Sequence, residues 1–133
     1  MKFFISSHLI EEMIHHSIST LPEEACGLVG GKDNRGLSVI GVENEVHSSS
    51  GYRMDPRQQL EAMLSFEKVW HEMVGIYHSH PNGPEHPSET DVAQAYYPDA
   101  VTLILSPGGD GWVCKAFQMS MNGFLDVEII RFE

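Results

Sequence analysis

Basic residues are scarce in this sequence, which has 8 Lys and Arg against 19 Asp and Glu and a formal net charge of −11 at pH 7. Proteins that bind nucleic acids neutralise the phosphates with Lys and Arg side chains, so this composition disfavours such binding. We therefore expect no nucleic-acid partner. Long apolar runs are absent as well. The apolar stretch from Phe3 to Ile5 is too short for a signal-peptide core, and no run approaches transmembrane length. We therefore expect no contact with a membrane.

Cysteine is equally rare, since Cys26 and Cys114 are the only two and no Cys-x-x-Cys pattern occurs. Both lie in apolar segments, which predicts buried, reduced thiols and hence a cytoplasmic location. The sequence is 41% hydrophobic and 20% charged, as in ordinary globular proteins. Its 133 residues predict a single domain covering residues 1–133. Such a chain buries roughly two thirds of its unfolded surface, so it needs neither a disulfide nor a metal merely to fold.

Apolar periodicity predicts helices that alternate with strands at first, followed by a part in which strands dominate. This pattern predicts an α/β fold with one mixed β-sheet flanked by helices. In the second helix we expect Leu60, Met63, Leu64, Val69 and Met73 along one side, the buried one, and we expect His8, His15 and His16 of the first helix to face solvent. The expected strands cover about 2–5, 25–30, 37–46, 73–77, 100–105, 112–119 and 124–132, and the expected helices about 7–20, 56–72 and 88–97.

The stretch from Ile76 to Asp91 carries the clearest chemical pattern. Side chains two apart on a strand point to the same face, so His78 and His80 would project together from the strand's end. Ser88 opens the pattern Ser-Glu-Thr-Asp, which is typical of a helix N-cap and places Asp91 in the first turn. If this helix folds back over the strand end, one carboxylate meets two imidazoles. Two His and one Asp with an open fourth position form a plausible catalytic zinc shell.

Each part of this pattern also has a simpler interpretation. A His-x-His pair alone is weak evidence for a metal, and Ser88 and Asp91 alone fit helix capping. Their combination in this order favours the metal site. Two other motifs fail: the segment 27–32 lacks the spacing of a P-loop, and Gly75 stands where a zincin needs its second histidine.

A zinc hydrolase also needs a carboxylate that moves a proton from the attacking water to the leaving amine. Glu24 precedes the apolar strand at 25–30, where a carboxylate is otherwise a poor choice. A position on the surface is the alternative for Glu24. Glu23 and Glu89 are its competitors for the role.

Taken together, the motifs resemble the JAMM metalloprotease family, the catalytic branch of the MPN domains. The resemblance covers nearly the whole chain, and the spacing of its His, Ser and Asp positions is specific. It rests on His78-Ser-His80-Pro, Ser88, Asp91, the glutamate-led strand 24–30, Asn44 and the segment 52–56.

The resemblance implies an MPN domain with a cytidine-deaminase-like α/β sandwich. It also implies one Zn²⁺ per chain, bound by His78, His80 and Asp91. Glu24 would be the acid/base catalyst, and Ser88 would stabilise the tetrahedral oxyanion. Catalytic members cut peptide or isopeptide bonds after the C-terminal Gly-Gly tail of ubiquitin or ubiquitin-like proteins.

At 133 residues the chain has little room for the insertions with which larger members grip ubiquitin chains. It is similar to the minimal bacterial or archaeal form, which implies a ubiquitin-like or sulfur-carrier protein as substrate. Two alternatives stay open: a non-catalytic MPN scaffold that binds partner proteins, and another zinc hydrolase on the same fold. A nucleoside deaminase is disfavoured because the Pro-Cys-x-x-Cys ligand pair is absent. The sequence leaves the carrier's identity and the oligomeric state open.

Overall fold

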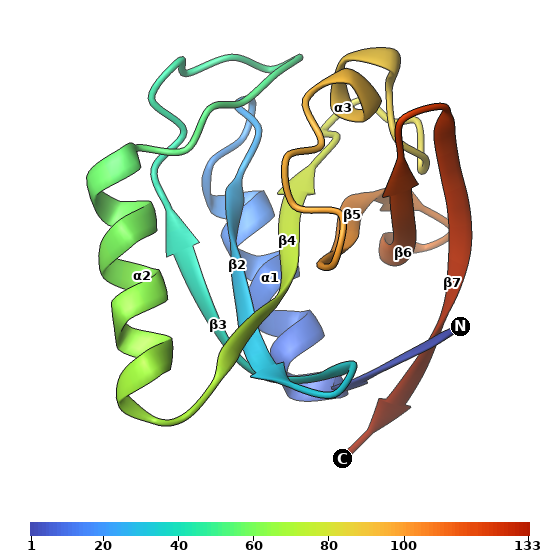
Figure 1. Cartoon of the computed structure of the whole chain (residues 1–133). Helices are drawn as coiled ribbons and strands as arrows, with labels where there is room; N and C mark the ends of the chain where they lie inside the picture. Colours follow the sequence, from blue (N-terminus) through green and yellow to red (C-terminus); the bar gives the residue numbers. More distant parts are fainter.

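The computed structural model describes residues 1–133, whose strands form one strongly curved sheet that closes on itself (Figure 1). The strand order is β1-β3-β2-β4-β5-β6-β7, and the parallel pairing of β1 with β7 completes the closure. The mixed α/β prediction is confirmed, whereas the closure was not predicted. The strands are β1 (Lys2–Ser6), β2 (Cys26–Lys32), β3 (Arg35–Val42), β4 (Glu72–Ser79), β5 (Val101–Gly108), β6 (Gly111–Ser120) and β7 (Gly123–Phe132), and the helices are α1 (Ser7–Ser19), α2 (Pro56–Lys68) and α3 (Glu89–Ala93).

The two long helices pack on opposite faces of the sheet, as Figure 1 shows for α1 behind β2 and β4 and for α2 beside β3. Neighbouring strand residues point to opposite faces, so β2 serves both helices. Val29 lies in one core cluster with Ile10 and Met13 of α1. Leu28 lies in a second cluster with Phe66 of α2. The candidate site lies at the end of the sheet where β2 begins and β4 ends.

The buried side of α2 differs from the expected one. The structure buries Ala62 and Phe66, one turn apart, whereas Leu60 and Leu64 are 56% and 47% exposed. A Cβ added to Gly30 would lie 2.4 Å from the Phe66 ring, so the missing side chain at that position admits the ring. The prediction for Leu60 and Leu64 was therefore wrong, because the fit of one aromatic ring against a glycine sets the rotation of the helix.

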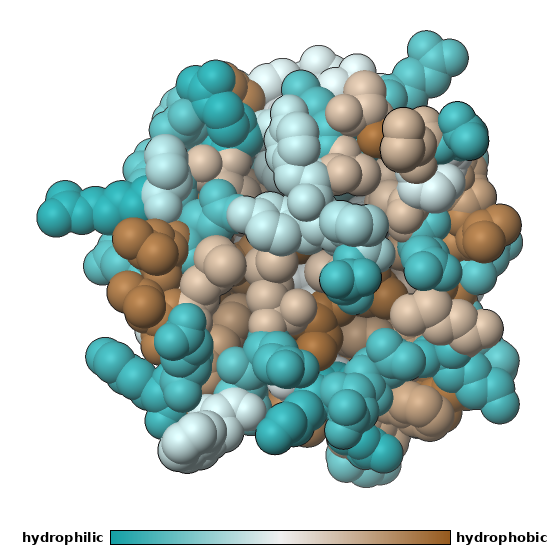
Figure 2. All heavy atoms as spheres, viewed as in Figure 1, coloured by the Kyte–Doolittle hydropathy of each residue, from teal (hydrophilic) through white to brown (hydrophobic).

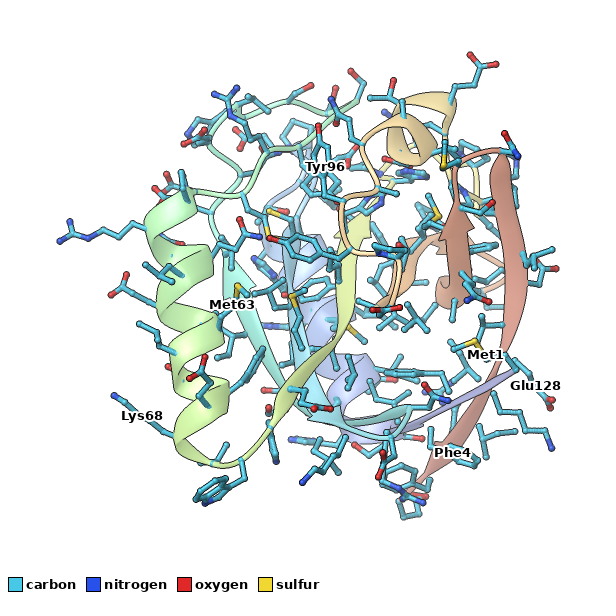
Figure 3. The ribbon with its side chains drawn as sticks, viewed as in Figure 1. Met1, Phe4, Met63, Lys68, Tyr96 and Glu128 are labelled. Carbon is cyan, nitrogen blue, oxygen red and sulfur yellow. The ribbon has the colours of Figure 1, made fainter.

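The surface of α2 reflects this rotation. Figure 2 shows apolar side chains gathered on the α2 side of the molecule, where Leu60 and Leu64 are exposed. In Figure 3, Met63 points from α2 towards the sheet and Lys68 points away from it. Met63 is thus partly buried, as predicted, and so is Met73, which lies in β4, whereas Val69 is 56% exposed and its prediction was wrong.

Three elements are shorter than expected: β3 ends at Val42, α2 at Lys68 and α3 at Ala93. The helices α1 and α2 have 13 residues each. No helix has the length and apolar character that crossing a membrane requires. At the closure of the sheet, the Glu128 N–H donates to the Met1 carbonyl at 3.1 Å, and Figure 3 shows the two residues side by side.

The C-terminal half of α1 contacts the sheet through a histidine. His8 and His15 are exposed, as predicted, but His16 is half-buried and its Nδ1 lies 2.6 Å from the Tyr77 hydroxyl. Burial lowers the pKa of His16. The prediction of a solvent-facing His16 was wrong because the sheet curves around α1 and brings Tyr77 against it.

Candidate metal centre

The end of β4 places two histidines on the same side of the sheet. His78 lies opposite Cys26 of β2 and Ile104 of β5. The His80 N–H donates to the Leu105 carbonyl at 2.9 Å, so the pairing with β5 continues past the last residue of β4. His78 and His80 are 1% and 6% exposed. The strand alternation read from the sequence thus holds, and it buries both imidazoles.

Glu24 is held at the same end of the sheet by contacts of its backbone and of its neighbour. The Ala25 N–H donates to Ser79 Oγ at 2.8 Å, and Asn44 Nδ2 donates to the Glu24 carbonyl at 3.1 Å. The Glu24 residue is only 4% exposed. The alternative of a surface position for Glu24 is therefore wrong, and its carboxylate lies inside the site.

The two competing glutamates lie elsewhere. Glu23 Oε1 is 3.0 Å from Nδ1 of the exposed His47, and this contact raises the pKa of His47. Glu89 is exposed on the first turn of α3. Neither carboxylate is paired with the two buried histidines.

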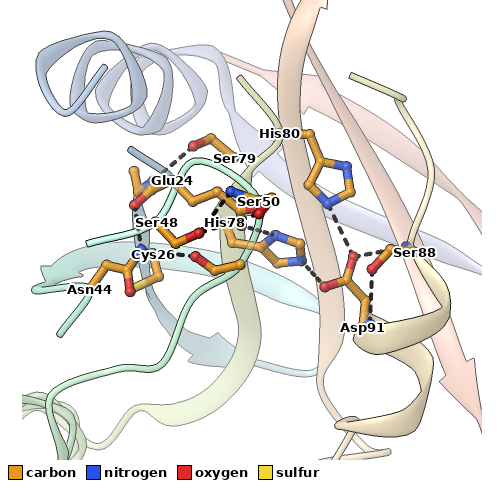
Figure 4. Close-up of polar contacts among 12 residues, drawn as sticks. Glu24, Cys26, Asn44, Ser48, Ser50, His78, Ser79, His80, Ser88 and Asp91 are labelled. Carbon is orange, nitrogen blue, oxygen red and sulfur yellow. Dashed lines mark hydrogen bonds and ion pairs between the residues drawn. The ribbon is translucent and has the colours of Figure 1, made fainter. Parts of the chain in front are cut away.

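Asp91 completes the cluster from α3, which folds over the end of β4 (Figure 4). Its Oδ2 lies 3.1 Å from His80 Nε2, and its Oδ1 lies 3.6 Å from His78 Nε2. Burial opposes ionisation of Asp91, but the His80 and Ser88 hydrogen bonds and the nearby His78 hold its pKa well below the usual range. Burial likewise opposes protonation of His80, but the Asp91 and Pro84 contacts raise its pKa.

The donor atoms at this end of the sheet fit a metal ion. One donor atom from each of Glu24, His78 and His80 can be chosen so that the three lie within 4.8 Å of one another. Glu24 Oε1 and His78 Nδ1 are buried, 3.4 Å apart, and neither makes a hydrogen bond. Buried polar atoms without partners are rare and require an explanation such as a bound ion or an ordered water. With Asp91 the site offers two imidazoles and two carboxylates, a donor set that fits a divalent ion such as zinc.

Two nearby residues had no assigned role in the sequence interpretation. The Tyr52 ring stacks on the His78 imidazole with centroids 4.5 Å apart. Cys26 is buried as predicted, and burial together with Glu24 raises the pKa of its thiol to about 12. Tyr52 could have been suspected only from its place in the segment 52–56, because its contact with His78 depends on the path of the preceding loop.

Two buried histidines and two carboxylates at the end of a strand are typical of a mononuclear metal-dependent hydrolase, in which one carboxylate binds the ion and the other moves protons. Residues 6–119 match the family described as prokaryotic homologs of the JAB domain. The match spans most of the chain, and the protein belongs to this family. The resemblance to the JAMM and MPN proteins is thereby confirmed.

Individual relatives agree with this assignment. The CysO-cysteine peptidase of Mycobacterium tuberculosis is 35% identical over 104 residues, which cover 77% of this chain and 71% of the relative. The desampylase of Pyrococcus furiosus is 34% identical over 98 residues, which cover 72% of this chain and 70% of the relative. The solution structure of protein DSY2949 from Desulfitobacterium hafniense matches with a TM-score of 0.89 and 36% identity, covering 100% of this chain and 94% of that one.

Proposed function

We propose that the protein is a zinc-dependent peptidase or isopeptidase that cleaves after the C-terminal Gly-Gly tail of a ubiquitin-like or sulfur-carrier protein. The observation that carries the proposal is the convergence of Asp91 with the buried Glu24, His78 and His80 in one cluster. The names of the two relatives, CysO-cysteine peptidase and desampylase, support a hydrolytic activity of this kind.

In this proposal His78, His80 and Asp91 bind one Zn²⁺, and Glu24 remains free to move protons. Asp91 suits the ligand role because each of its oxygens faces Nε2 of a different histidine. Glu24 lies instead on the Nδ1 side of His78. Bound zinc would lower the pKa of a coordinated water towards about 7 and polarise the scissile carbonyl.

Glu24 would accept the proton of the attacking water and deliver it to the leaving amine. The three proposed ligands cannot serve as this base because their lone pairs are committed to the metal. Ser88 Oγ accepts the Asp91 N–H at 3.0 Å. This contact uses an oxygen lone pair, so the Ser88 hydroxyl proton is free to stabilise a tetrahedral oxyanion.

Burial of the centre favours a slender substrate segment. Glu24 and His78 are 4% and 1% exposed, so a peptide reaches them only if its side chains do not block the approach. A Gly-Gly tail has no side chains and meets this condition. The acidic chain, with a net charge of −11, suits a protein substrate better than a nucleic acid.

A cleavage assay tests this function. It uses the full chain, because we propose that the chain acts as one domain. The substrate is a small ubiquitin-like protein joined through its Gly-Gly tail to a reporter, and the matched control carries Ala-Val in place of Gly-Gly. We expect release of a product that ends in Gly-Gly, loss of cleavage after chelation, and recovery with zinc. Stoichiometric zinc without cleavage of any Gly-Gly substrate would favour the non-catalytic scaffold.

A further inference from the structure

The ring of Tyr52 lies almost flat against one of the proposed zinc ligands. Its centroid is 4.5 Å from that of the His78 imidazole, and the two planes meet at 25°. Tyr52 comes from the connection between β3 and α2, whereas His78 comes from β4. Two segments far apart in the sequence therefore meet face to face at the site.

The loop that carries Tyr52 is fixed to the backbone of the catalytic region. Asn44 is 6% exposed, and its Nδ2 donates to the carbonyls of Glu24 and Gly51, each at 3.1 Å. Its Oδ1 accepts the Arg53 N–H at 3.2 Å. Gly51 and Arg53 flank Tyr52, so the amide of Asn44 sets the position of the Tyr52 ring relative to Glu24.

The two histidines differ in what orients them. Metal-binding histidines usually hold their second ring nitrogen in a hydrogen bond, which fixes the plane of the imidazole. His80 has this support, because its Nδ1 lies 2.8 Å from the Pro84 carbonyl. His78 does not, because its Nδ1 makes no hydrogen bond. The Glu24 carboxylate lies 3.4 Å from this nitrogen without a hydrogen bond, and the stacked Tyr52 ring is a contact that restrains the plane of His78.

We infer that Tyr52 is a positioning residue that holds the His78 imidazole in its metal-binding orientation. The stacked ring takes the place of the hydrogen bond that orients His80. The inference rests on the proposed function, because it assumes that His78 binds zinc. The planar ring carries the effect, and the hydroxyl is dispensable for it.

Three variants separate the ring from the hydroxyl and from general effects of the substitution. Tyr52→Phe keeps the stacked ring, Tyr52→Leu removes it, and Tyr96→Leu makes the same change at a tyrosine that is 77% exposed. Zinc affinity is measured by competition with a chromophoric chelator, the ligand geometry by the visible spectrum of bound Co²⁺, and folding by the melting temperature without metal. If Tyr52→Leu does not fold, Tyr52→Met replaces it.

We expect Tyr52→Leu to weaken zinc binding roughly tenfold and to alter the Co²⁺ spectrum, as losses of supporting contacts around a metal do. Its metal-free melting temperature should stay near that of the wild type. Tyr52→Phe and Tyr96→Leu should bind zinc like the wild type. The inference is overturned if Tyr52→Leu keeps full affinity, if Tyr52→Phe is equally weakened, or if the metal-free melting temperature falls with the affinity. A wild-type protein that binds no zinc would instead contradict the proposed function.

Discussion

Ser88 and Asp91 exchange two hydrogen bonds at the start of α3. The Asp91 N–H donates to Ser88 Oγ at 3.0 Å, and the Ser88 N–H donates to Asp91 Oδ2 at 2.9 Å. This capping box fixes the start of α3 and aims the Asp91 carboxylate at His78 and His80. One local motif therefore serves both the fold and the proposed metal site.

Ser88→Asp distinguishes capping from catalysis. Aspartate caps a helix about as well as serine, so the melting temperature should stay close to the wild-type value. A carboxylate cannot donate to an oxyanion and repels its charge. Loss of one such donor typically lowers the rate by roughly 10²–10³. Steady-state kinetics and thermal unfolding on the same sample test both expectations, and an active Ser88→Asp enzyme would limit Ser88 to capping.

Metal analysis separates the ligands from the acid/base residue. The wild type should carry about one zinc per chain, and Asp91→Ala should lose most of it because a three-ligand site is incomplete without the carboxylate. Glu24→Ala should retain zinc. The control is Glu89→Ala, which changes an exposed residue of α3, the helix that carries Asp91. Full zinc occupancy in both His78→Ala and Asp91→Ala would show that the ligand assignment is wrong.

Gly27→Ala should destabilise the fold. An added Cβ would lie 2.3 Å from the Tyr77 ring and 2.6 Å from the Ile40 carbonyl oxygen, and the backbone oxygen cannot move away easily. Overpacking of this kind typically costs about 1–3 kcal/mol. Urea denaturation measures the free energy of unfolding. Gly111→Ala is the matched control, because its added Cβ has no atom within 4 Å apart from its neighbours in the chain. Equal stability of the two variants would contradict the expectation.

His16 should make stability depend on pH. Because burial lowers its pKa from the usual 6.5, the unfolded chain takes up the proton at a higher pH than the folded protein does. The His16 contribution is therefore complete above pH 6.5 and is lost as the pH falls towards the folded-state value. Unfolding free energies between about pH 7.5 and about pH 5 should fall less steeply for His16→Gln than for the wild type. Parallel curves would show that His16 has no such effect.

The parts of the site that follow from local sequence rules were predictable. The period of two along β4 puts His78 and His80 on one face, and the Ser88 capping box is present as expected. The burial of Glu24 was not decidable locally, because it depends on Ser79 and Asn44 from distant segments. The ligand and catalytic roles of these residues stay predictions, as do the single domain and the cytoplasmic location.

The features of the fold that were predicted wrongly or missed also depend on contacts between distant segments. Leu60 and Leu64 were expected in the core by periodicity alone, but the space beside Gly30 admits Phe66 and turns them outwards. Closure of the sheet joins β1 to β7, the two ends of the chain, and no local pattern in either strand reveals it. Tertiary packing decided each of these features.

The cleavage rate of Glu24→Gln tests the central claim most directly. Glutamine keeps the shape and hydrogen-bonding capacity of the side chain but cannot shuttle a proton, a function that typically contributes about 10²–10⁴-fold to the rate. Zinc content, affinity for the Gly-Gly carrier and cleavage rate are measured on one preparation, with Glu23→Gln as the control. We expect Glu24→Gln to keep its zinc and its carrier affinity and to lose at least about 10²-fold in rate, while Glu23→Gln stays active. Cleavage by Glu24→Gln at the wild-type rate would contradict the account.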